Sequence, residues 1–157
     1  MKKYFINWKY LNRIIITINS ITIILGGIYT YTQFHIIKNE QLNRENDLSM
    51  RYYDRLNFGD NKKIYILIED QKPVLINAGG EFSEDQLDDY LGELHDVGES
   101  LYADLLDNRS TCSRFSDLTE RTFENQEVQK YLTKIRKIDP EYFLGVDDLY
   151  YFVKTCN

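Results

Sequence analysis

The pattern of apolar and polar residues divides the chain near residue 37. No Lys, Arg, Asp or Glu occurs between residues 14 and 37, and isoleucine dominates the first half of this stretch. About 20 apolar residues in a helix cross a hydrocarbon core of about 30 Å, and in lipid a helix satisfies all of its own backbone polar groups. The pattern predicts a transmembrane helix at about residues 13–34, preceded by a basic segment at residues 1–12.

Aromatic residues flank the predicted span at both ends, where amphipathic rings favour the membrane interface. They are Trp8 and Tyr10 before the span and Tyr29 and Tyr31 at its far end. A cleavable signal peptide has a similar basic start followed by an apolar run. The uncharged run is too long for that class of segment, and no A-x-A-like cleavage site follows Leu25. A retained single-pass anchor is therefore favoured.

The basic residues on the two sides of the predicted span bear on its orientation. Those before it are Lys2, Lys3, Lys9 and Arg13, and those that follow within about 15 residues are Lys38, Arg44 and Arg51. The flank richer in Lys and Arg usually stays in the cytoplasm. The count leans by one charge toward a cytoplasmic N-terminus and an external domain.

After the span, long stretches without Pro or Gly predict further helices. A juxtamembrane helix at residues 35–58 has one apolar edge, formed by Leu48, Tyr52 and Leu56 at four-residue steps. The run at residues 63–70 is apolar on both sides and predicts a short buried helix that ends before Pro73. Residues 59–157 are expected to form one helical domain.

The central helix of that domain is predicted at residues 84–106. Ser83 and Gln86 have the spacing of a capping box. Apolar residues then recur at three- and four-residue steps, so that one face, including Leu94 and Leu101, is directed toward the core. The residues expected on the opposite, solvated face are Asp89, Glu93, Asp96 and Ser100.

Three more helices complete the predicted bundle. One contains Cys112, Phe115, Leu118 and Phe123, a second is capped by Asn125, and a short third covers about residues 145–154. The predicted fold class is all-α, with one N-terminal transmembrane helix followed by a small helical bundle.

Composition and charge narrow the possible functions. Apolar residues make up 43% of the 157-residue chain and aromatic residues 14%, which is enough to build a core. After residue 13 there are 15 basic and 25 acidic residues, a net charge of −10. A surface of this sign repels phosphate backbones, so nucleic acid is excluded as the main partner.

Several of these core and capping positions carry a resemblance to a known family. The residues are 82–91, Val97 with Gly98, Leu101 with Tyr102, 105–107, Val128, Tyr131 with Leu132, and Ile135 with Arg136. In this order they resemble a bacterial domain-of-unknown-function family of small single-span membrane proteins. The resemblance covers about residues 25–154 and implies one span, a helical bundle and a cytoplasmic domain. The longer basic N-terminus departs from the family, and the resemblance identifies no catalytic residues.

Two groups of residues are candidates for a metal site or a catalytic site. Asp88, His95 and Glu99 fall near one helix face and could ligate a metal, but Gly92 occupies the position where a di-iron bundle needs glutamate. Cys112 near Ser110 could act as a nucleophile with His95 as its base. A solvated polar face explains the first group better, and nothing in the sequence fixes the distances in the second. We therefore predict no catalytic, cofactor or metal site.

The two cysteines, Cys112 and Cys156, lack the short spacing of metal and redox motifs. Two unpaired thiols, at least one of them packed in the core, are the simplest expectation. A bridge between them requires a domain outside the reducing cytosol.

The predicted span carries small and polar residues suited to helix association. Asn19, Thr22, Gly26 and Thr30 lie on or near one face at three- and four-residue steps, a pattern that lets helices approach closely. The sequence thus favours a membrane-anchored interaction or scaffolding module, with the bilayer and another protein or a second copy as partners. A small membrane enzyme, or an immunity or toxicity protein acting through its span, is the alternative.

Overall fold

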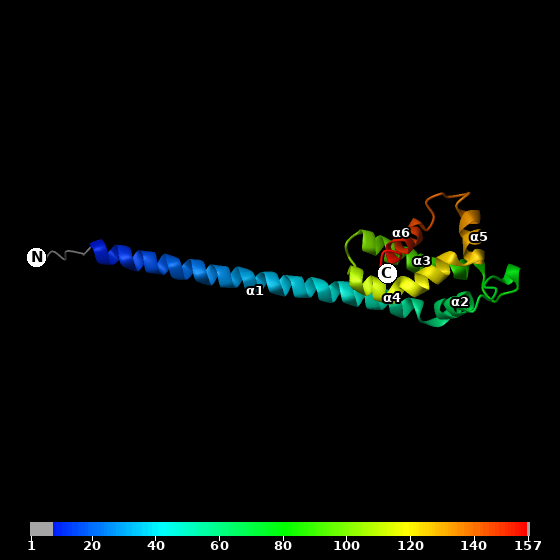
Figure 1. The fold of residues 1–157 in the computed structure, drawn as a ribbon, viewed down its shortest axis with the longest axis horizontal. Helices are drawn as coiled ribbons and strands as arrows, with labels where there is room; N and C mark the ends of the chain where they lie inside the picture. Colours follow the sequence, from blue (N-terminus) through cyan, green and yellow to red (C-terminus); the bar gives the residue numbers. More distant parts are fainter. Residues whose placement is uncertain (1–7, 157) are drawn as a thin grey trace, which may run out of the picture. The chain divides into compact units, whose positions relative to one another are not determined.

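The computed structural model describes the backbone of residues 8–156 and the side chains of residues 17, 19 and 21–156. Every long element in this part of the chain is an α-helix (Figure 1). The helices are α1 (Trp8–Leu56), α2 (Gly59–Glu69), α3 (Glu84–Tyr102), α4 (Asn108–Glu124), α5 (Gln126–Ile135) and α6 (Leu144–Val153), with a 3₁₀ turn, η1, at Ile76–Ala78. The predicted all-α class and the helical bundle are confirmed.

The chain forms two compact units, Met1–Leu42 and Asn43–Asn157, and α1 contributes residues to both. Within the described residues, the structure contains no helix with the length and apolar character needed to cross a bilayer. The predicted span at residues 13–34 includes positions 13–16, 18 and 20, whose side chains lie outside the described residues.

Side-chain caps fix where three helices of the second unit begin. Ser83 and Gln86 form the predicted capping box at the start of α3, and the Asn125 side chain accepts from the backbone N–H groups of Glu127 and Val128 at the start of α5. The α4 cap is Asp107, whose carboxylate accepts from the Ser110 N–H at 2.8 Å. These contacts satisfy backbone donors that have no partner within the helix.

The central helix is shorter than predicted. It ends at Tyr102 instead of residue 106, because Asp104 adopts a left-handed conformation, with φ of 55°, that the helix cannot continue through. Leu105 is consequently half exposed, and its neighbour Leu106 takes the buried position. The helical period fails at this point because the backbone turns.

The core of the second unit surrounds α3, whose residues Leu87, Tyr90, Leu91, Leu94 and Val97 are buried. Two residues predicted on its solvated face are placed differently. Glu93 pairs with Arg55 of α1 at 3.2 Å, and Ser100 is buried with its hydroxyl 3.0 Å from the Tyr52 hydroxyl. The end of α1 covers this part of the face, which the period of α3 alone could not reveal, whereas Asp89 and Asp96 are exposed as predicted.

The last part of α1 belongs to this core. Tyr52 and Leu56 are buried and Leu48 is partly buried, as the four-residue spacing predicted. Arg114 of α4 donates to the side chain of Asn46 at 2.9 Å, which fixes α4 to the same segment. The predicted short helix before Pro73 is confirmed as α2, with Ile64 and Ile68 buried.

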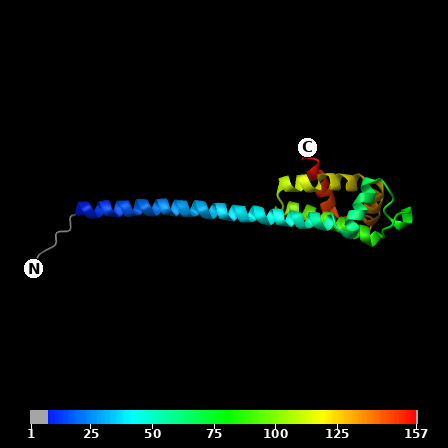
Figure 2. The ribbon, with the colours of Figure 1, turned by 90° about the horizontal axis from the view of Figure 1, so that it is seen from below.

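The most extensive helix contact in the second unit joins α3 to α6, which also packs against α4 (Figure 2). A Cβ atom added at Gly98 would lie 1.9 Å from the Gly145 carbonyl oxygen, and one added at Gly145 would lie 2.4 Å from the His95 carbonyl oxygen. Neither position can hold a side chain without separating the two backbones. Val146, Leu149 and Val153 are buried along the rest of α6.

This contact predicts opposite effects for two glycines of the same helix. We expect Gly98→Ala to lower the unfolding free energy by at least about 2 kcal/mol, because the methyl group forces α3 and α6 apart. A Cβ at Gly92 meets only Phe143 Cε1, at 3.8 Å. Gly92→Ala should therefore raise stability by about 1 kcal/mol through helix propensity. Chemical denaturation of both variants measures the difference, and a shift of the same sign in both would refute the contact.

Candidate functional site

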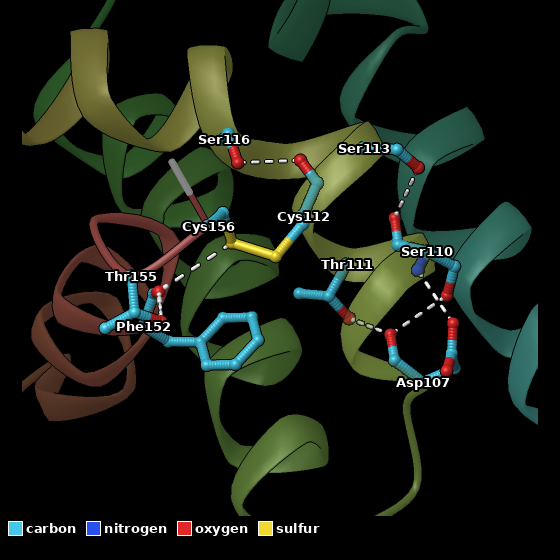
Figure 3. The surroundings of a disulfide bond; sticks show 9 residues. All are labelled: Asp107, Ser110, Thr111, Cys112, Ser113, Ser116, Phe152, Thr155 and Cys156. Atoms are coloured by element: carbon cyan, nitrogen blue, oxygen red, sulfur yellow. Dashed lines mark hydrogen bonds between the residues drawn. A yellow bond between two sulfur atoms is a disulfide. The ribbon is translucent and has the colours of Figure 1, made fainter.

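The two cysteines form a disulfide between α4 and the end of α6 (Figure 3). Their Cα atoms are 5.7 Å apart, within the range of protein disulfides. Local hydrogen bonds order both sides of the bridge: the Ser116 hydroxyl donates to the Cys112 carbonyl at 2.6 Å and the Thr155 hydroxyl to the Phe152 carbonyl at 2.7 Å. The expectation of two unpaired thiols is wrong, because the fold brings together residues 44 positions apart.

The fold does not assemble Asp88, His95 and Glu99 into one site. His95 Nδ1 accepts from the Gly145 backbone N–H at 2.9 Å, so this nitrogen carries no proton. Asp88 accepts from the Tyr131 hydroxyl at 2.5 Å, and Glu99 is exposed. Among residues with described side chains, no group of three or more His, Cys, Asp or Glu is arranged to hold a metal ion.

Cys112, the candidate nucleophile, is also engaged in the fold. The sulfur of Cys112 is bonded to Cys156 and cannot act as a thiolate in this state. The Ser110 hydroxyl donates to the Asp107 carbonyl at 3.0 Å, and the imidazole of His95 is held at the start of α6. Each side chain therefore serves the fold.

The predicted association face lies in the first unit. Asn19, Thr22, Gly26 and Thr30 are all exposed on α1. The Thr30 hydroxyl donates to the Gly26 carbonyl at 2.9 Å, and no atom lies within 4 Å of a Cβ built at Gly26. The face is open to a close neighbour, and association through it stays a prediction.

A cavity of about 920 Å³ lies between the segment that follows α2 and the corner joining α4 to α5. Charged residues of both signs dominate its lining: Lys72, Arg121, Lys130 and Lys134, with Glu69, Glu84, Glu124 and Glu127. We call this cavity the charged groove. Sequence analysis missed it, since its walls come from residues 68–84 and 121–134, which only the fold brings together.

Glu127 fixes one wall of the charged groove. Its two carboxylate oxygens accept from the backbone N–H groups of Val74 and Leu75 at 2.9 and 2.8 Å. Val74 and Leu75 are buried, so their donors need this partner. At the same end, Lys134 pairs with Glu84 at 2.6 Å and joins α5 to the first turn of α3. The wall is held by charge-assisted bonds.

Burial and hydrogen bonding shift several pKa values near the groove. Burial and the hydrogen bond to Asp88 raise the pKa of Tyr131. Burial, with the hydrogen bond to Asp117, also raises the pKa of Tyr65. Hydrogen bonds from Tyr65 and Arg121 hold the pKa of Asp117 below its usual range. The tyrosines therefore stay neutral donors, which suits them to hold carboxylates in place.

The chain matches no protein-family model, no curated protein and no solved structure. The resemblance to a family of single-span membrane proteins stays a prediction. Three features of the chain bear on its function: an exposed helix with many apolar side chains, a disulfide-linked bundle and a groove lined by charged residues of both signs.

The Glu127 carboxylate should contribute strongly to the stability of the fold. Removing it leaves two buried N–H groups without an acceptor, and hydrogen bonds to charged groups contribute about 1.5–3 kcal/mol each. Since the site is partly exposed, we expect Glu127→Ala to lower the unfolding free energy by about 2–4 kcal/mol. Glu69→Ala, at an exposed position of the same groove, should change it by less than about 0.5 kcal/mol. Equal denaturation midpoints for the two variants would contradict the role of Glu127.

Two carboxylates should give opposite pH dependences. Burial, only partly offset by Arg55, raises the pKa of Glu93 above 4.5. Ionised Glu93 therefore lowers the free energy of unfolding, and the protein regains this stability as the pH falls toward 4.5. The pKa of Asp117 is lowered in the folded protein. Ionised Asp117 therefore contributes stability above pH 3.8, and this contribution is lost as the pH falls through the pKa of Asp117 in the folded protein.

Unfolding free energies measured across pH should separate the two groups. Glu93→Gln should gain less stability than the native chain when the pH is lowered from 7 to 4.5. Asp117→Asn should lose less than the native chain below pH 3.8. Parallel curves for all three proteins would mean that neither carboxylate is perturbed.

Proposed function

We propose that the protein is a membrane-anchored interaction module, with the N-terminal part of α1 as its bilayer anchor. The observation that carries this proposal is the exposure of apolar side chains on successive positions of α1. Ile23, Ile24 and Leu25 are 74%, 61% and 61% exposed. Because successive helical residues point about 100° apart, these three lie on different sides of the helix.

A helix that exposes large apolar side chains on several sides is stabilised by an apolar environment. Water is unfavourable for such a surface, which costs about 25 cal/mol per Å² of apolar area. Two of the segment's polar side chains satisfy their own donors, since the Thr30 and Thr32 hydroxyls donate to the carbonyls of Gly26 and Ile28 at 2.9 and 2.7 Å. With no charge between residues 14 and 37, a single transmembrane helix satisfies all of these constraints.

The second unit supports binding more than catalysis. His95 and Cys112 are both engaged by the fold, and lysine, arginine and glutamate side chains line the charged groove. A concave surface with polar groups fixed by the backbone is suited to recognition. We infer that a protein partner, or a second copy of the chain, binds the anchored domain.

Membrane extraction tests the anchor. The full chain should sediment with membranes and stay there after carbonate treatment. Replacing Ile24 and Gly27 together by Arg should release it, since each central Arg costs about 2.5–3.5 kcal/mol of insertion free energy. Ile138→Arg, at an exposed apolar position of the second unit, is the matched control and should remain in the membrane. Recovery of the native chain in the soluble fraction would refute the anchor.

A further inference from the structure

We propose that the disulfide-linked second unit lies on the oxidising, external side of the membrane, with the N-terminus in the cytoplasm. This inference rests on the proposed function, because it assigns the two sides of the anchor. It departs from the family resemblance, which implies a cytoplasmic domain. It also identifies the environment in which any partner of the charged groove must be found.

The first support is the disulfide between Cys112 and Cys156. Glutathione and thioredoxin keep thiols reduced in the cytosol, whereas disulfides persist in oxidising compartments. Both cysteines are partly exposed, and Cys156 lies in the segment that follows α6. Its position therefore offers no strong shielding from soluble reductants. A stable bond at this position indicates an oxidising compartment.

The second support is that contacts other than the bond also hold α6 against α3 and α4. The Gly98 and Gly145 backbones pack closely, and Val146, Leu149 and Val153 are buried along α6. Lys154 pairs with Glu120 at 3.0 Å and with Glu124 at 2.9 Å, which holds the end of α6 beside α4. These contacts would favour the pairing of Cys156 with Cys112 once a disulfide donor is available.

The bond itself requires a disulfide donor. In the balanced exchange, the two cysteine thiols transfer two electrons and two protons to the disulfide of a small molecule or an oxidoreductase, which leaves as two thiols. The donor is thus a disulfide, either of a small molecule or of an oxidoreductase, in the external compartment. The chain would meet it only after its second unit has crossed the membrane.

The third support is independent of the cysteines. The basic residues before the anchor are Lys2, Lys3, Lys9 and Arg13, against Lys38, Arg44 and Arg51 after it. By the positive-inside rule, this difference of one charge favours a cytoplasmic N-terminus. The difference is small by itself, but it has the same direction as the disulfide.

The test uses the full chain in intact cells and two engineered cysteines. Asp96→Cys places a thiol on an exposed position of the second unit, and Lys3→Cys places one before the anchor. We expect a membrane-impermeant maleimide to label the thiol at position 96 nearly completely without lysis. The thiol at position 3 should be labelled only after the membrane is permeabilised.

The redox state is measured on the native chain from the same cells. After acid trapping and alkylation, Cys112 and Cys156 should take up no label, and prior reduction should add two labels per chain. Labelling of position 3 instead of position 96, or two free thiols in the trapped native chain, would overturn the inference. Carbonate extraction of the same samples distinguishes the failures: a chain that stays in the membrane retains the anchor, and one that is extracted loses both proposals.

Discussion

The backbone contact between Gly98 and Gly145 is the constraint on which the second unit depends. It brings α6 against α3 closely enough for His95 Nδ1 to accept from the Gly145 N–H, so the first turn of α6 is held by a side chain of α3. Arg136 strengthens the same end, because its guanidinium donates to the Phe143 carbonyl at 3.1 Å and pairs with Asp147. The disulfide holds the other end of α6. A helix of only ten residues is thus fixed at both ends.

The position of α6 determines that of α4, and through α4 that of the charged groove. The bridge joins α6 to the first half of α4, and the Tyr90 hydroxyl lies 2.6 Å from the Thr122 hydroxyl in the core, which joins α3 to the second half. The corner at Asn125 then directs α5 so that Glu127 reaches the backbone of Val74 and Leu75. The groove is therefore a consequence of helix packing, and no local sequence motif marks its charged residues.

Local patterns predicted the helices well, and long-range contacts explain the failures. The capping box at Ser83, the cap at Asn125 and the apolar stripe of α3 are signals within a few residues of each other, so they could be identified from the sequence. Gly98 offered no such signal, since a glycine within a helix by itself only lowers helix propensity. The placements of Glu93 and Ser100 depend on α1, because Arg55 lies 38 residues before Glu93 and Tyr52 lies 48 residues before Ser100. The disulfide and the charged groove depend on the whole fold in the same way.

The disulfide also connects stability to compartment. Closing a loop of 44 residues removes chain entropy worth about 4 kcal/mol at 25 °C in the loop-closure model. A domain of this size is typically stable by only about 5–15 kcal/mol, so the bond is a large fraction of the total. In a reducing compartment the same sequence would depend on its remaining contacts, among them the Gly98–Gly145 packing and the core around α3. The redox state of the compartment in which the second unit folds is therefore a term in its stability, and the chain gains that term only where the two thiols can be oxidised.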